Sequence, residues 1–67
     1  MLKLLIKNNA PKNAYDKIFK IIDNHTTFMR YSTENEYKVN DGYVLEFHSI
    51  PSDAYLEISD LSYIEEL

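Results

Sequence analysis

Glu46 and His48 form the acid and histidine pair with the clearest chemical potential in the chain. They flank Phe47 in a segment with strand character, and side chains two positions apart lie on one face of a strand. A carboxylate beside an imidazole can ligate a metal ion or transfer a proton, and Glu57 could complete a trio if the next strand pairs alongside. The solvated face of a small antiparallel sheet has the same composition without any chemistry. We therefore expect a polar sheet face here, with no catalytic residue, metal ion or cofactor.

Nucleophilic catalysis and phosphate binding have weaker support. Ser49 and Ser52 follow His48 closely, but a nucleophile needs a base that a third group orients, and no glycine-flanked turn surrounds these serines. Gly42 is the only glycine, so the sequence has no glycine-rich loop to cradle a phosphate. The chain also has no cysteine, which excludes disulfides and thiolate ligands for zinc. We expect a protein that is not an enzyme.

Charge is distributed very unevenly along the chain. Residues 1–33 carry six basic and two acidic side chains, a net charge of +4, whereas residues 34–67 carry one basic and nine acidic side chains, a net charge of −8. The basic residues come from a predicted strand and the outer face of a predicted helix, so they need not form one patch. The overall charge of −4 opposes binding to a phosphate backbone. We therefore expect no direct contact with nucleic acid.

The acidic half is the better candidate for a functional surface. Carboxylates on a rigid scaffold can imitate the phosphates of DNA and occupy a basic cleft, and tyrosines suit such a contact because they combine a large ring with a hydroxyl. The plainer interpretation is that an acidic surface serves solubility alone. The residues predicted to contact a partner are Glu46, Tyr55, Glu57, Asp60, Tyr63, Glu65 and Glu66.

The first part of the chain predicts a strand followed by a helix. Leu2, Leu4 and Ile6 alternate with Lys3, Leu5 and Lys7, so the run has the period of a strand over residues 2–7, with a centre that is apolar on both sides. Pro11 is favoured as a first helical residue because it has no N–H group to leave unpaired. From residue 12 to about residue 23 apolar side chains recur at helical spacing, which predicts a helix with one buried face.

A β-hairpin is predicted in the middle of the chain. Asn40-Asp41-Gly42 favours a tight turn between residues 37 and 50, because glycine accepts the positive φ that such a turn requires. Residues 26–33 are rich in β-branched and aromatic side chains, so residues 26–33 and 37–39 form either two short strands or one bulged strand. The return strand, residues 43–50, would turn Tyr43, Leu45 and Phe47 toward the core.

Residues 52–67 allow two interpretations. Leu56 and Ile58 alternate with Tyr55 and Glu57, which predicts a last strand over residues 54–58 with the tyrosine and glutamate outward. A short helix over residues 60–67 would follow, capped by a serine or an aspartate. In the competing interpretation residues 52–67 form one helix, but its apolar side chains would then point all round the axis. The first interpretation is preferred.

These patterns together predict one domain over residues 1–67 of the α+β class, with the element order β-α-β-β-β-α. The sheet would be antiparallel, with four or five strands, one helix packed on a face and a short C-terminal helix. The apolar run at the N-terminus is too short for a signal peptide or a membrane span, so we expect a cytoplasmic protein without a membrane partner.

The function that these features favour is a small, non-enzymatic protein-binding module. Its abundant Asn, Lys, Ile and Tyr are typical of AT-rich genomes and their phages. We therefore expect a phage or accessory inhibitor or regulator that docks its acidic half on the basic surface of a nucleic-acid-handling protein. The alternative is a structural module that forms homo-oligomers, with the uncovered sheet face paired with a second copy and the charge asymmetry orienting subunits head to tail. A small enzyme that uses Glu46 and His48 is the third hypothesis.

Overall fold

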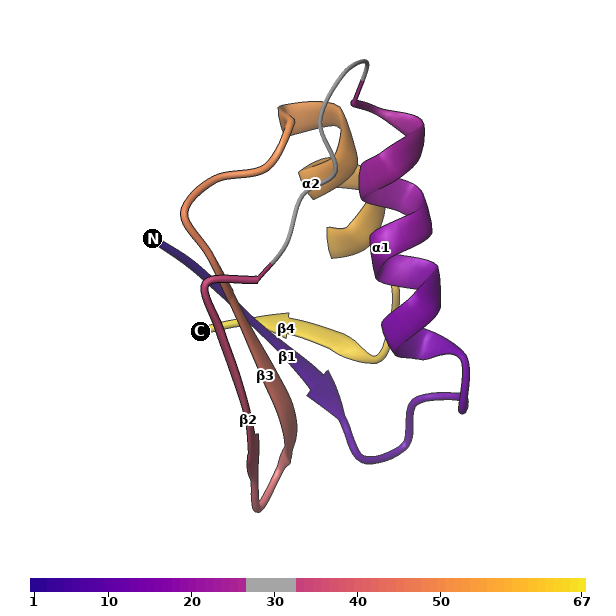
Figure 1. The fold of residues 1–67 in the computed structure, drawn as a ribbon. Helices are drawn as coiled ribbons and strands as arrows, with labels where there is room; N and C mark the ends of the chain where they lie inside the picture. Colours follow the sequence, from indigo (N-terminus) through magenta and orange to yellow (C-terminus); the bar gives the residue numbers. More distant parts are fainter. Residues whose placement is uncertain (27–32) are drawn as a thin grey trace.

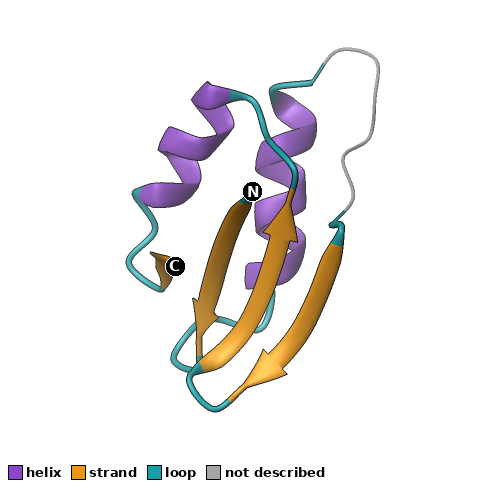
Figure 2. Cartoon of the chain, turned by 90° about the vertical axis from the view of Figure 1, so that its left-hand side faces the viewer, coloured by secondary structure: helices purple, strands orange, loops and turns teal. Residues whose placement is uncertain are grey.

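The computed structural model describes residues 1–26 and 33–67 of the chain. Within this described part, four antiparallel strands form one sheet in the order β2-β3-β1-β4, and two helices lie on one of its faces (Figure 1, Figure 2). The elements are β1 (Leu2–Lys7), α1 (Ala14–Asn24), β2 (Asn35–Val39), β3 (Gly42–Phe47), α2 (Ser52–Ser59) and β4 (Ile64–Glu66). The fold is α+β, with an antiparallel sheet and a helix packed on its face, as the sequence predicts.

β1 is a central strand of the sheet, and its bounds are those that the sequence predicts. It pairs with β3 along one edge and with β4 along the other. Leu4 and Ile6 face the helices, whereas Leu5 is buried on the opposite face. Because β1 is paired on both edges and its side chains are buried on both faces, all three consecutive residues Leu4, Leu5 and Ile6 are apolar.

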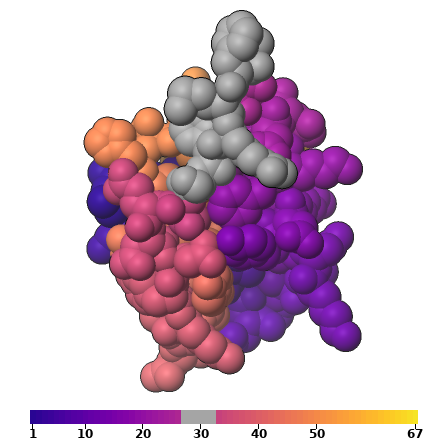
Figure 3. All heavy atoms as spheres, in the orientation of Figure 1, coloured from indigo at the N-terminus to yellow at the C-terminus, as the bar shows by residue number. Residues whose placement is uncertain are grey.

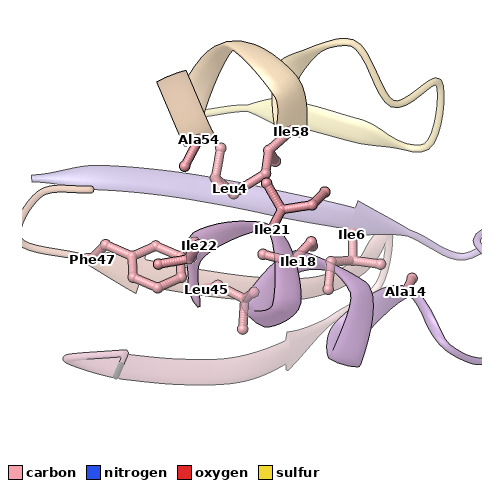
Figure 4. Close-up of a cluster of buried hydrophobic side chains, with 10 residues drawn as sticks. All are labelled: Leu4, Ile6, Ala14, Ile18, Ile21, Ile22, Leu45, Phe47, Ala54 and Ile58. Carbon is pink, nitrogen blue, oxygen red and sulfur yellow. The ribbon is translucent and has the colours of Figure 1, made fainter. Parts of the chain in front are cut away.

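The core lies between α1, α2 and the helix-facing side of β1 and β3 (Figure 4). Ile18 and Ile22 of α1 are fully buried and meet Leu45 and Phe47 of β3. The ring of Phe47 lies 5.8 Å from that of Phe19, centre to centre. Each fully buried aliphatic side chain contributes about 1.5–3 kcal/mol, far more than the surface charge pairs of α1 can supply. Burial of this apolar face therefore holds α1 on the sheet.

The hairpin between β2 and β3 forms at the predicted turn. Gly42 has a φ of 153°, and a Cβ atom there would lie 1.9 Å from the carbonyl oxygen of Ile6. Glycine is therefore required both by the backbone conformation and by the close approach of β1. β2 begins at Asn35, two residues before the predicted strand. The predicted strand over residues 26–33 lies almost wholly outside the described residues.

The C-terminal part of the chain corrects the preferred interpretation of the sequence. Residues 54–58, predicted to be a strand, belong to α2, and the predicted helix over residues 60–67 is replaced by a turn and the short strand β4. The competing interpretation, a helix over residues 52–67, is right for its first half only. The element order is thus β-α-β-β-α-β.

Packing explains why residues 52–59 form a helix and residues 64–66 a strand. Ala54 and Ile58 are fully buried one helical turn apart, and Leu61 packs on the same core one turn further on. This stripe covers the core beside α1 and leaves Leu56 in solvent. β4 pairs with the edge of β1 that β3 leaves open and so satisfies backbone N–H and C=O groups there.

Candidate functional site

The exposed face of α2 combines carboxylates with an exposed leucine. Asp53, Leu56, Glu57 and Asp60 follow the spacing i, i+3, i+4, i+7, which places them on one side of a helix. Leu56 is 61 % exposed, whereas Ala54 and Ile58 on the other side are fully buried. We call these four residues the α2 face. Leu56 is one of five large apolar side chains that the described structure leaves exposed, and it is the one that lies on a helix between carboxylates.

Contacts on both flanks fix the position of the α2 face. On the side of α1, Glu57 lies 2.8 Å from the Nε2 atom of His25. On the side of β4, the hydroxyl of Tyr55 donates a hydrogen bond to the carboxylate of Glu66, and this bond raises the pKa of the tyrosine. The α2 face is therefore presented by a helix that is held at both edges.

The electrostatics of the α2 face are dominated by free carboxylates. Neither Asp53 nor Asp60 forms a side-chain hydrogen bond or an ion pair within residues 1–26 and 33–67. Asp60 also stands at the C-terminal end of α2, where the last turn contains no basic residue. A negative charge at this end opposes the helix dipole, which disfavours it by about 0.3–1 kcal/mol. Asp60 thus costs stability where it stands, unlike Asp53 in the first turn.

The structure brings some of the predicted contact residues together and separates the others. Tyr55, Glu57, Asp60 and Glu66 lie on α2 and the adjoining strand β4. Glu65 pairs with Leu5 and so lies on the opposite face of the sheet from Glu66, whose partner is Leu4. The predicted acidic surface is therefore divided by the sheet.

Glu46 and Tyr63 are held within the protein by other contacts. Glu46 lies on the open face of the sheet and accepts a 2.7 Å hydrogen bond from the hydroxyl of Tyr37. Tyr63 packs against the core, and its hydroxyl oxygen is buried without a hydrogen-bond partner in the described part of the structure. Tyr63, chosen as a partner contact because it lies in the acidic tail, is therefore half-buried against the core of its own chain. The sequence analysis also missed Asp53 and Leu56, which only the helical spacing of residues 52–60 would have revealed.

The trio proposed for catalysis or metal binding does not assemble. The side chain of His48 is 85 % exposed and lies 3.8 Å from Glu34, not against Glu46. Glu57 is on α2 with His25. Among the described residues, no group of three or more His, Cys, Asp or Glu side chains is arranged to hold a metal ion. No helix in the same part of the chain is long and apolar enough to cross a membrane.

A second polar cluster, which the sequence analysis did not predict, surrounds Glu36 on the edge strand β2. Its carboxylate accepts hydrogen bonds from the hydroxyls of Thr33 at 2.7 Å, Tyr43 at 2.9 Å and Tyr15 at 2.9 Å. These bonds hold the pKa of Glu36 below its ordinary value, with Thr33 the largest cause. A carboxylate that keeps its charge in this way is a weak base, so the cluster serves to tie β2 to α1 and β3.

No family model matches the chain, and no significant match is found among curated proteins or among solved structures.

Proposed function

We propose that this chain is a small, cytoplasmic, non-enzymatic protein-binding module that docks its α2 face on a basic surface of another protein. Asp53, Glu57 and Asp60 supply the charge, and Leu56 is the apolar anchor. Tyr55 and Glu66 border the contact. The observation that supports this proposal best is the 61 % exposure of Leu56 between three carboxylates on one side of a helix.

The two components of the α2 face have different roles in such a contact. Burial of Leu56 against a partner supplies affinity, because a buried leucine side chain contributes about 1.5–3 kcal/mol. The carboxylates accelerate encounter with a basic surface and disfavour acidic partners. Asp53, Glu57 and Asp60 lie on average about 5 Å apart along the helix axis, whereas the charges of one DNA strand lie about 3.4 Å apart along its axis. The carboxylates of the α2 face are therefore spaced more widely than phosphates. The proposed target is a basic protein surface such as a nucleic-acid-binding cleft, in which the carboxylates would take the place of some of the phosphates.

The test compares two variants that carry the same change in charge. Asp53→Asn/Glu57→Gln/Asp60→Asn removes the charge of the α2 face, and Asp16→Asn/Glu34→Gln/Glu65→Gln removes three carboxylates elsewhere. Tagged proteins would be used to recover partners from a cell lysate at low and at high salt, with thermal unfolding as the control for folding. We expect one basic protein to be recovered by the wild type and the second variant at low salt only.

A third variant, Leu56→Ala, separates charge from apolar contact. It keeps the helix and all carboxylates, and we expect it to weaken binding to the recovered partner about 30-fold, the effect of about 2 kcal/mol at an anchor. Recovery that is the same for the wild type, the α2-face variant and Leu56→Ala would refute the proposed function.

A further inference from the structure

A groove with a basic rim lies at the end of the sheet where β1 leads into α1. It has a volume of about 310 Å³, and its floor and walls include Ile6, Ala10, Pro11, Ala14, Tyr15 and Tyr43. Figure 3 shows the two sides, with β2 and the hairpin turn at the left and the β1–α1 connection with α1 at the right. The tyrosine hydroxyls are both bonded to Glu36, so the groove presents mainly apolar atoms of their rings.

Three lysines line the groove, and none of them has an acidic partner in the part of the chain that the structure describes. Lys7 ends β1, Lys12 precedes α1, and Lys38 belongs to β2. No ion pair joins any of them to a carboxylate within residues 1–26 and 33–67, and no described carboxylate lines the groove. The ligand that best fits this apolar groove and its three lysines is therefore one that carries an apolar group between negative charges.

The α2 face carries an apolar group between negative charges, and it lies on a different part of the molecule from the groove. It offers one exposed leucine and three carboxylates to a groove with three lysines. Figure 4 shows α2 and β4 on one side of α1, and β2 and β3 on the other. The groove is lined by the end of β1, the β1–α1 connection, the start of α1 and the β2–β3 hairpin. With α1 between them, the two surfaces of one molecule cannot meet, but those of two molecules can.

We propose that the basic groove binds the α2 face of a second copy of this chain, with Leu56 in the groove and Asp53, Glu57 and Asp60 facing Lys7, Lys12 and Lys38. This inference rests on the proposed function, since it names a partner for the same α2 face. The contact joins two different surfaces, so it orients copies head to tail and leaves a free groove and a free α2 face at the ends. Chains or closed rings follow, and the contact weakens with salt.

The open sheet face is a poorer surface for pairing with a second copy. Leu5 and Val44 at its centre are only 4 % and 1 % exposed in the single chain, so a second copy would bury little more of them, and only Tyr37 on β2 adds an exposed ring among the described residues of this face. The head-to-tail contact instead covers Leu56, whose side chain is mostly in solvent.

Analytical ultracentrifugation of the purified protein tests this inference. The wild type would be compared with a groove variant, Lys7→Gln/Lys12→Gln/Lys38→Gln, and with the α2-face variant Asp53→Asn/Glu57→Gln/Asp60→Asn. The concentration would range from about 10 μM to about 1 mM, where contacts of modest area associate. We expect the mass of the wild type to rise with concentration at low salt, and each variant alone to associate at least about tenfold more weakly.

Mixing the two variants distinguishes this arrangement from others. The groove variant keeps an intact α2 face, and the α2-face variant keeps an intact groove, so an equimolar mixture should form a dimer of twice the 7.9 kDa monomer mass and grow no further. The control variant Lys3→Gln/Lys17→Gln/Lys20→Gln loses the same charge outside the groove and should behave as the wild type.

Two results would overturn the head-to-tail contact. One is a wild type that stays monomeric over the whole range at low salt. In that case, a partner that the wild type recovers from lysate and the α2-face variant does not would still support the proposed function. A partner that only the groove variant fails to recover would assign the groove to a different, acidic protein. The other is a dimer that both variants form as readily as the wild type, which would place the contact on a surface outside the groove and the α2 face.

Discussion

Gly42→Ala should be among the most destabilising single substitutions in this chain, although it adds only one methyl group. The alanine would have to adopt a φ of 153°, and its Cβ atom would lie 1.9 Å from the carbonyl oxygen of Ile6 and 2.9 Å from the carbonyl carbon. These are backbone atoms of the central strand, so no rotation of a side chain can relieve the overlap. β1 and β3 must separate where Lys7 pairs with Gly42.

The size of the effect follows from two contributions. A backbone conformation reserved for glycine costs about 1–3 kcal/mol in alanine. Separation of the strands loses one or two ladder hydrogen bonds at about 1 kcal/mol each. The sum, about 2–5 kcal/mol, is a large part of the total stability of a domain of this length, about 3–10 kcal/mol.

Urea unfolding followed by circular dichroism measures this loss. With a urea dependence near 1 kcal/mol per molar for so small a domain, the midpoint should fall by at least about 2 M. Asp41→Ala is the matched control in the same turn, because the backbone carbonyl of Asp41 that accepts from Asn8 is retained, and we expect a change under about 0.5 kcal/mol. Chemical synthesis of the chain with D-alanine at position 42 offers a second control, because a D residue favours positive φ and carries its methyl group on the other side. A loss below about 1 kcal/mol for Gly42→Ala would refute the geometric argument.

Three further substitutions probe the polar contacts. Glu36→Gln should lower the free energy of unfolding by about 1 kcal/mol at pH 7, after allowance for solvent around the cluster. Because the pKa of Glu36 is lowered in the folded protein, this stabilisation is present above the ordinary glutamate pKa of about 4.3 and is lost as the pH falls through the lower folded value, so urea titrations near pH 3 should show the two proteins converging. Tyr63→Phe should raise the free energy of unfolding by about 1 kcal/mol, since it removes a buried hydroxyl without a partner, and a loss in the same assay would show that this hydroxyl is bonded. Asp60→Asn should raise stability by about 0.3–1 kcal/mol while weakening association of the protein in ultracentrifugation, and a fall in stability would contradict the dipole argument.

The elements that were predicted correctly depend on local patterns. β1 has apolar residues at alternate positions 2, 4 and 6, α1 has a continuous apolar face, and Gly42 specifies the hairpin through its own backbone conformation. Residues 52–67 were assigned in the wrong order because Ala54, Leu56 and Ile58 fit a strand, while Ala54, Ile58 and Leu61 fit a helix. The two sets differ in Leu56 and Leu61, and which of these leucines is buried depends on what α1 and β1 leave uncovered.

The candidate site was predictable in its charge but not in its arrangement. The acidic half is evident from composition, yet the alternation of β4 places Glu65 and Glu66 on opposite faces of the sheet. Glu46 lies on β3, on the same face as Glu65, and is hydrogen-bonded to Tyr37. The groove is harder still to predict. Its three lysines, Lys7, Lys12 and Lys38, come from separate segments of the chain. They line one groove only because the hairpin lies beside the start of α1 in the folded protein.

The placement of charge relative to the helix ends supports binding rather than solubility as the role of these surfaces. Lys12 stands beside the N-terminal end of α1 and Asp60 at the C-terminal end of α2, each at the helix end whose dipole disfavours it. Solubility alone would be served equally well with the charges at the favourable ends. In the proposed head-to-tail contact, however, the C-terminal end of α2 would approach the N-terminal end of α1 in a second copy. Asp60 and Lys12, each unfavourable at its own helix end, would then attract each other and the opposite helix dipole. A substitution such as Asp60→Asn should therefore have opposite effects on folding and on association, which a purely structural role for Asp60 does not predict.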